Sequence, residues 1–461
     1  MTLKEYLRSI AGRSVGVVGA GISNRPLVSI LAEAGIDVTV YDRSDAAALG
    51  GFYKDSVDHG VKFQLGDGYL DRLEGDILFR TPGLHPFHPA LRAAAERGAI
   101  VTSEMELFLS LCPCRVFAVT GSDGKTTTTT IISDLLKAAG YTVHLGGNIG
   151  RPLLPETDEI KKDDMVVLEL SSFQLHSMRC APDVAVITNI SPNHLDVHPS
   201  YEDYIEAKKQ IYLHQSPTAR LVLNLDNETA AACAEDAPGT VCWFSRKKTV
   251  ENGAFLREDG MICLAGDGGS REVLPAADLM IPGDHNVENV LAAFAAVRGC
   301  VPPEVMADTA RRFTGVAHRL EKIRTLRGVT YINDSIASSP NRTIAGLACF
   351  QKKVILIAGG KDKGISYDAI GPAVCRHVKK LFLTGMTAGV IKSAVKKAPE
   401  YKPGSPEIFL IDGFADAIRA AAACAEEGDV VLLSPASTSF DRFKNFEERG
   451  NAFRKVVEEL L

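Results

Sequence analysis

The sequence predicts an α/β fold with several domains, and three observations carry this prediction. Short β-branched runs alternate with Ala- and Leu-rich stretches along the whole chain. The runs are apolar without alternation, which is typical of strands buried on both faces of a parallel sheet. The 461 residues correspond to about three domains of ordinary size. We therefore expect repeated strand–helix units that form mostly parallel sheets.

The expected strands are distributed along the whole chain. They are residues 15–20, 37–42, 115–121, 164–170, 183–190, 353–360, 380–385 and 429–435. Helical stretches over 104–111 and 304–313 each precede a change in pattern, so we place domain boundaries there and expect domains over 1–111, 112–314 and 315–461. Gly-rich turns between about 220 and 280 indicate a strand-containing part of the middle domain.

Composition excludes several classes of protein. With 51 Lys+Arg against 57 Asp+Glu, the net charge of −6 argues against a general binder of nucleic acid or of anionic membranes. No uncharged apolar run reaches the ~18 residues of a membrane span, and the charged N-terminus lacks a signal-peptide core. Apart from Cys112-Pro-Cys114, the ten cysteines are scattered singly, without CxxC spacing. We therefore expect a cytoplasmic protein.

The most specific motif lies in residues 116–140, where an apolar strand runs through a glycine loop into an amphipathic helix. Glycines let backbone N–H groups surround phosphate oxygens, the helix start adds positive dipole character, and Lys125 adds a charge. A Thr hydroxyl can hold Mg²⁺. The loop is shorter than GxxxxGK[ST], but its order of elements predicts ATP binding. The expected ATP-binding residues here are Gly121, Ser122, Asp123, Gly124, Lys125, Thr126 and Thr127.

A second glycine loop, residues 19–24, also follows a strand and precedes a helix. Asp42 ends the next strand, which gives most of a dinucleotide-binding pattern. The third glycine is missing, because Asn24 and Arg25 stand there. From the residues alone, an NAD site and a simple tight turn both remain open.

Polar residues follow two strands of the middle domain. Glu169 ends the strand over 164–170, where a carboxylate faces the ligand crevice of a parallel sheet, and it could bind Mg²⁺ together with Thr126. His194 follows the strand over 183–190, but Mg²⁺ disfavours imidazole. Ser200 and Asp203 resemble a capping box for a helix over 201–215. That helix contains Lys208 and Lys209, which spacing alone predicts to be solvated.

The loop TGSDGKTTT resembles that of the Mur ligase and folylpolyglutamate synthase superfamily. Similar segments extend over essentially the whole chain, at 146–150, 169–175, 193–196, 282–289, 318–319 and 434–450. The resemblance implies an ATP-dependent amide-bond-forming ligase with a Rossmann-like UDP-sugar domain, a P-loop-type central ATPase domain and a Rossmann-like amino-acid domain. Segments ELSSFQL and FKNFEERG are similar to the members that add D-glutamate to UDP-N-acetylmuramoyl-L-alanine through an acyl phosphate, in cytoplasmic peptidoglycan precursor synthesis. We expect a monomer.

The resemblance also implies functional residues, carried over position by position. The UDP-sugar site would comprise Gly19, Ala20, Gly21, Ile22, Ser23, Asp42, Arg43, Thr81, Pro82, Gly83, Asn148, Ser171, Gln174 and His194. Further ATP contacts would be Asn286, Asn289, Arg319 and Asp334, and D-glutamate contacts Ser338, Lys363, Ser439 and Phe446. The implied Mg²⁺ ligands are Thr126, Glu169, His194 and Lys208 as a carbamate, and the implied catalytic residues are Lys125, His194 and Lys208.

Lys208 carries the least expected of these roles. An ammonium repels Mg²⁺, whereas a lysine carbamylated by CO₂ presents two anionic oxygens. Burial would favour the reaction, because only the neutral amine attacks CO₂. Lys209 is a rival by spacing, and the flanking Ala207 and Ile211-Tyr212 place Lys208 in the family register.

One segment departs from the family. Where members often read NDSKATN, this chain reads Asn333-Asp-Ser-Ile-Ala-Ser-Ser339. Ser338 keeps a hydroxyl, but Ile336 removes a charge contact with substrate, for which Lys361 is a candidate replacement.

Three alternative functions predict different behaviour. Another ligase of the superfamily would add a different amino acid. An NAD-dependent oxidoreductase built on the first glycine loop would bind NAD without hydrolysing ATP. An ATP-regulated binding protein would bind ATP without forming an acyl phosphate.

Overall fold

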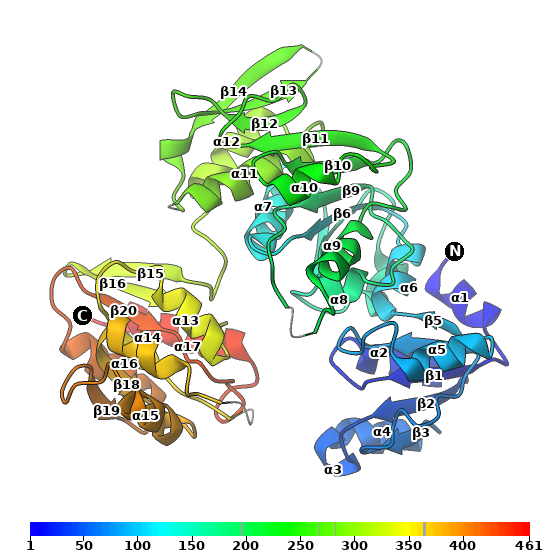
Figure 1. Cartoon of the computed structure of the whole chain (residues 1–461), viewed down its shortest axis with the longest axis horizontal. Helices are drawn as coiled ribbons and strands as arrows, with labels where there is room; N and C mark the ends of the chain where they lie inside the picture. Colours follow the sequence, from blue (N-terminus) through cyan, green and yellow to red (C-terminus); the bar gives the residue numbers. More distant parts are fainter. Residues whose placement is uncertain (195–196, 267, 282, 363–365) are drawn as a thin grey trace. The chain divides into compact units, whose positions relative to one another are not determined.

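The computed structural model describes residues 1–194, 197–266, 268–281, 283–362 and 366–461. The chain divides into two compact units, Met1–Phe313 and Thr314–Leu461. Three sheets with flanking helices make up these units (Figure 1), which confirms the α/β fold class with mostly parallel sheets. Among the helices of the described residues, none is long and apolar enough to cross a membrane.

The first sheet has five parallel strands in the order β3-β2-β1-β4-β5. Its strands are β1 (Ser14–Val18), β2 (Asp37–Asp42), β3 (Lys62–Leu65), β4 (Ile77–Arg80) and β5 (Ile100–Thr102). Its helices are α1 (Leu3–Ser9), α2 (Asn24–Glu33), α3 (Ala46–Leu49), α4 (Gly51–Asp58), α5 (Pro89–Glu96) and α6 (Glu104–Leu111). The strand order reverses between β1 and β4, so the loops after these two strands meet at one crevice.

The second sheet belongs to the same unit and has nine strands, ordered β14-β13-β12-β11-β10-β9-β6-β8-β7. Pairing is parallel from β7 to β12 and antiparallel from β12 to β14. The strands are β6 (Arg115–Thr120), β7 (Val143–Gly147), β8 (Met165–Glu169), β9 (Val184–Ile187), β10 (Arg220–Asn224), β11 (Thr240–Ser245), β12 (Gly253–Leu256), β13 (Met261–Gly266) and β14 (Gly269–Pro275). Strands β10 to β14 account for the irregular, strand-containing region expected between about 220 and 280.

The helices around this sheet include those that carry the site. They are α7 (Lys125–Ala138), α8 (Ser172–Leu175), α9 (Tyr201–Lys209), α10 (Glu228–Ala232), α11 (Asp284–Val297) and α12 (Pro303–Arg312), with 3₁₀ turns η1 (Leu154–Glu159) and η2 (Ala276–Asp278). Helix α9 is shorter than the expected 201–215. It ends at Lys209, and the Ile211 N–H and Tyr212 N–H then donate to the carbonyls of Lys208 and Lys209, three residues earlier, which is the pattern of tighter turns.

The second unit contains a six-stranded sheet ordered β15-β16-β20-β17-β18-β19, with only β15 antiparallel to its neighbour. The strands are β15 (Glu321–Leu326), β16 (Val329–Asn333), β17 (Val354–Ala358), β18 (Val378–Leu383), β19 (Glu407–Leu410) and β20 (Val430–Leu433). The helices are α13 (Pro340–Leu347), α14 (Ile370–His377), α15 (Ala388–Lys397), α16 (Phe414–Ala423) and α17 (Phe446–Glu459). Every residue of the central strand β17 is buried, as its unbroken apolar run indicates.

Candidate functional site

The loop between β6 and α7 has the backbone geometry of an anion cradle. Gly121 has φ of 148° and Gly124 has φ of 78°, values that L side chains rarely adopt. A Cβ at Gly121 would collide with the Thr188 hydroxyl, and one at Gly124 with the side chain of Asn289. Helix α7 begins directly after Gly124, so its unpaired N–H groups face the loop. The loop therefore fits a phosphate group.

Two lysines converge on this loop. Lys125 Nζ donates to the carbonyl oxygens of Gly121 and Ser122 at 3.0 and 2.9 Å, and Lys208 Nζ donates to that of Gly121 at 2.8 Å. Lys208 is 1% exposed and lies over the ring of Tyr204. Burial, and then the nearby charge of Lys125, lowers the pKa of Lys208 well below its ordinary value. The residue predicted to be carbamylated is thus beside the phosphate loop.

Lys209, the rival by spacing, points elsewhere. Its ammonium pairs with Asp236 and with Glu206, away from the loop. The tertiary structure therefore distinguishes two lysines that the sequence places side by side.

The expected Mg²⁺ residues present oxygen ligands next to the loop. Thr126 Oγ1 donates to Glu169 Oε2 at 2.7 Å, and Asn148 Nδ2 donates to Glu169 Oε1 at 2.8 Å. A hydroxyl and a carboxylate side by side suit Mg²⁺, so these residues fit the ion that the sequence implies. His194 is exposed with φ of 54°, and its ring lies 5.2 Å from that of Phe173.

Helix α11 brings both expected adenine residues to the same region. Asn289 Oδ1 accepts from the Thr128 hydroxyl of α7 at 3.3 Å, and Asn289 Nδ2 donates to Asn286 Oδ1 at 3.2 Å. Since Asn289 also bounds Gly124, this pair and the phosphate loop form one continuous site.

The expected UDP-sugar residues gather at the switch point of the first sheet. A Cβ at Gly19, where φ is 89°, would lie 2.7 Å from Thr81 Cγ2, so the loops after β1 and β4 are in contact. Asp42 holds the first loop by accepting from the Ala20 N–H at 2.6 Å. Arg43 and Ile22 are exposed.

Three of the expected residues line one small cavity between the two sheets of the first unit. Ser23 comes from the loop after β1, Pro82 from the loop after β4, and Gln174 from α8 of the second sheet. Gln174 and Ser171 form a reciprocal capping box, which fixes Gln174 toward the cavity. The first two sheets therefore both contribute to the candidate UDP-sugar site.

Sequence reasoning missed two charged residues in this cavity. Arg80 is 1% exposed, and its guanidinium donates to Ser177 Oγ and the Phe173 carbonyl, which ties β4 to the segment around α8. Burial lowers its pKa to about 10, against the opposing charge of Glu106. Glu104 is also buried, and burial raises its pKa to about 7. The signal was an arginine inside the apolar run DILFR.

The second unit holds the expected ATP residues Arg319 and Asp334 and the expected D-glutamate residues. Buried Asp334 follows β16 and accepts from Ser434 Oγ at 2.8 Å and from the Leu320 N–H at 3.2 Å. Burial raises its pKa to about 6. Ser439 is buried, Ser338 is half-buried, and Arg319 is exposed. Lys363 lies outside the described residues.

Arg449 is the functional candidate that the sequence reasoning missed in this unit. It is 2% exposed, and its guanidinium donates to Ser335 Oγ, the Ser335 carbonyl and the Ser437 carbonyl at 2.8 to 3.0 Å. Ser335 in turn donates to the Phe446 carbonyl at 2.8 Å. Arg449 thus fixes the loops that carry Ser338, Ser439 and Phe446. Its signal was its place inside FKNFEERG.

Three mostly parallel sheets with flanking helices, and a glycine loop at a helix N-terminus, define an α/β protein of the nucleotide-phosphate-binding class. Two family profiles match this chain, the Mur ligase middle domain over residues 119–297 and the Mur ligase glutamate ligase domain over 318–437. A relative from Acetivibrio thermocellus named UDP-N-acetylmuramoylalanine–D-glutamate ligase is 51% identical over 99% of each chain, and one of that name from Ruminiclostridium cellulolyticum is 48% identical over 99% of each. The chain therefore belongs to the Mur ligase family, which confirms the resemblance.

Solved structures of other family members share the fold. MurF from Acinetobacter baumannii matches with a TM-score of 0.56 at 16% identity, covering 97% of this chain and 91% of that one. MurC from Thermotoga maritima matches with a TM-score of 0.53 at 17% identity, covering 97% and 99%. At these identities the likeness concerns the architecture alone.

Proposed function

We propose that this chain is the cytoplasmic ATP-dependent ligase that adds D-glutamate to UDP-N-acetylmuramoyl-L-alanine in peptidoglycan precursor synthesis. The full-length similarity to relatives with that name supports the substrates. The observation that carries the chemistry is the convergence of Lys125, Lys208 and the Thr126–Glu169 pair on one phosphate loop. ATP is then a substrate, and we propose that the enzyme acts as a monomer with the domains 1–111, 112–314 and 315–461.

The reaction has two balanced steps. A carboxylate is inert to amines at neutral pH, so the alanyl carboxylate first attacks the γ-phosphorus of ATP and displaces ADP to give an acyl phosphate. The neutral amino group of D-glutamate then attacks the acyl carbon. The tetrahedral intermediate loses phosphate and a proton and leaves the amide. Catalysis consists mainly of positioning and charge stabilisation.

The residues of the loop have distinct roles in this scheme. The N–H groups at the start of α7 hold phosphate oxygens, and Lys125 releases the loop carbonyls to neutralise charge on the transferred phosphoryl group. Thr126, Glu169, His194 and carbamylated Lys208 would hold Mg²⁺, which would neutralise charge on the phosphates when bound. Asn286 and Asn289 are proposed to contact the adenine, and Arg319 and Asp334 are further proposed ATP contacts.

Lys208 is proposed to carry a carbamate. Its neutral amine attacks CO₂, forms an N–C bond and loses one proton to give the anion. The lowered pKa of this buried lysine supports the proposal, because it raises the fraction of neutral amine. D-glutamate is proposed to contact Ser338, Lys363, Ser439 and Phe446, and the sugar nucleotide to contact the loops at Gly19 and Thr81.

Phosphate release tests the proposed function. Purified chain with ATP, Mg²⁺, UDP-N-acetylmuramoyl-L-alanine and D-glutamate is expected to release one phosphate per amide formed, and to release little with L-glutamate, other amino acids or no acceptor. Absence of phosphate with D-glutamate, or equal rates with another amino acid, would reject this substrate assignment. Reduction of NAD without ATP hydrolysis would favour an oxidoreductase.

A further inference from the structure

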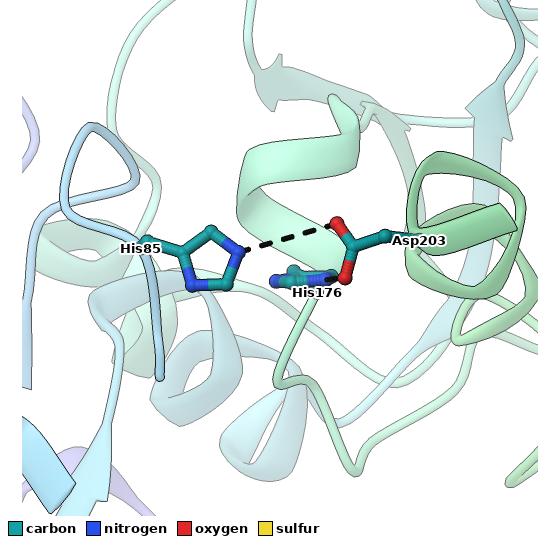
Figure 2. Close-up of side chains that lie close together, drawn as sticks. All are labelled: His85, His176 and Asp203. Atoms are coloured by element: carbon teal, nitrogen blue, oxygen red, sulfur yellow. Dashed lines mark hydrogen bonds and ion pairs between the residues drawn. The ribbon is translucent and has the colours of Figure 1, made fainter. Parts of the chain in front are cut away.

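Three potential metal ligands meet where the loop after β4 contacts the second sheet's segments (Figure 2). His85 follows β4, His176 follows α8, and Asp203 lies in the first turn of α9. Their ligand atoms all lie within 4.8 Å of one another. His176 is buried, and the other two are half-buried. This His85–His176–Asp203 cluster shares no member with the Thr126–Glu169 pair or with the proposed UDP-sugar residues, although His85 follows Gly83 and His176 follows Gln174 by two positions.

The spacing suits a four-coordinate ion. His176 Nε2 lies 2.9 Å from Asp203 Oδ1, and His85 Nε2 lies 4.0 Å from Asp203 Oδ2. Ligand atoms around tetrahedral Zn²⁺, with bonds of about 2.0–2.2 Å, are about 3.3–3.5 Å apart. The two distances end on different carboxylate oxygens, and the shorter one is a hydrogen bond, so a bound ion would replace that bond and take its place between the two imidazoles and the carboxylate.

One ring nitrogen in the cluster lacks a hydrogen-bond partner in the part of the chain that the structure describes. His85 Nε2 is buried and has no hydrogen-bond partner among the described residues, although it faces the Asp203 carboxylate (Figure 2). A buried polar atom without a partner is unfavourable, and a bound cation would satisfy it. Burial outweighs the attraction of Asp203 and lowers the pKa of both His85 and His176. Neutral imidazoles are the form that metals bind.

Neighbouring groups already orient the cluster. His198 bridges Asp203 Oδ2 through Nδ1 at 2.7 Å and Ser172 Oγ through Nε2 at 3.0 Å. The ring of Phe87 lies 5.6 Å from that of His85 and 5.4 Å from that of His176. A hydrogen-bonded carboxylate inside an aromatic shell is the kind of surrounding that fixes metal ligands in place.

We propose that His85, His176 and Asp203 form a binding site for a divalent transition metal ion of the zinc class. Two imidazoles and one carboxylate favour such an ion over Mg²⁺, and three protein ligands leave a fourth position for water. The ion joins the loop after β4 to α9, the helix that also carries Lys208. It therefore positions α9 and takes no part in phosphate transfer.

Zinc alone, added to the chelator-treated full chain, tests the site without any assay of ligase activity. Calorimetry and competition with a chromogenic chelator are expected to show one ion that the His85→Gln and Asp203→Asn variants lose or bind at least ~10-fold more weakly. His144→Gln is the matched control. His144, in β7, lies 2.9 Å from Asp164 in a similar histidine–carboxylate pair. The His144→Gln variant should therefore bind zinc as the wild type does.

Two further measurements keep the proposal testable where a variant folds poorly. Cobalt added to the wild-type chain should give the visible absorption of a four-coordinate site, and zinc should raise the thermal unfolding midpoint of the wild type and of His144→Gln. Failure of the wild type to bind zinc or cobalt would overturn the proposal. So would equal binding by the wild type and folded His85→Gln, because the ion would then lie elsewhere.

Discussion

Lys125 and Lys208 both donate to the carbonyl oxygen of Gly121, at 3.0 and 2.8 Å. Two ammonium groups beside one carbonyl repel each other, and only Lys208 is almost fully buried. Burial, followed by the charge of Lys125, lowers the pKa of Lys208. The lowered pKa supports the proposed reaction of Lys208 with CO₂, because the reactive form is the neutral amine.

Replacing Lys208 tests the carbamate. Lys208→Ala is expected to lower turnover by about 100-fold or more, since it removes charge stabilisation next to the transferred phosphate. Added short carboxylic acids should restore part of the rate by supplying the missing oxygens. Lys209→Ala is the control and should keep most activity, because Lys209 pairs with Asp236 and Glu206. Indifference of the Lys208 variant to added acids would contradict the carbamate.

The contact between Gly19 and Thr81 predicts a stability difference between two glycines of one loop. Gly19→Ala adds a Cβ at a φ of 89° and 2.7 Å from Thr81 Cγ2, which should cost about 1–3 kcal/mol. Gly21→Ala places its Cβ in open space and should leave the unfolding midpoint nearly unchanged. Thermal unfolding of the two variants measures this, and equal midpoints would show that the loops do not meet as described.

Glu104 predicts a pH dependence of the first unit's stability. Its folded pKa of about 7 lies above the ordinary value of 4.5, so the folded state holds the proton more tightly. As the pH rises from 4.5 to 7, Glu104 ionises in the unfolded chain before it ionises in the folded one. The free energy of unfolding therefore falls by up to about 3 kcal/mol over this range, and the contribution of Glu104 stays constant above about pH 7. Glu104→Gln should flatten this decline in thermal unfolding followed against pH. Glu106→Gln, on the same helix, should retain it.

Arg449 predicts a selective loss at the amino-acid site. In Arg449→Lys, the single lysine nitrogen cannot replace the three guanidinium nitrogens that donate to Ser335 and Ser437. The substitution should raise the KM for D-glutamate about 10-fold or more and leave the KM for ATP little changed. Arg442→Lys is the matched control, since Arg442 forms an ion pair with the exposed Asp412. Equal effects of the two substitutions would argue against a positioning role.

Sequence reasoning described the fold class and the phosphate loop well because both depend on local patterns. The buried runs at 115–121 and 353–360 appear as β6 and β17, and Gly121 and Gly124 adopt the positive φ values that make glycine necessary there. The end of α9 was misplaced, because the helical spacing continues to 215 whereas the structure changes to three-residue turns after Lys209.

The sequence by itself determined an α/β fold with mostly parallel sheets and a glycine loop suited to nucleotide phosphates, because strand and glycine patterns act within a few residues. Only the tertiary structure showed Lys208 beside the phosphate loop and Lys209 in ion pairs elsewhere, placed Arg80, Glu104 and Arg449 in buried positions, and assembled His85, His176 and Asp203. These residues come from separate strands, helices and loops. Their pKa values and contacts arise from burial and from neighbours distant in the chain, which no local pattern records.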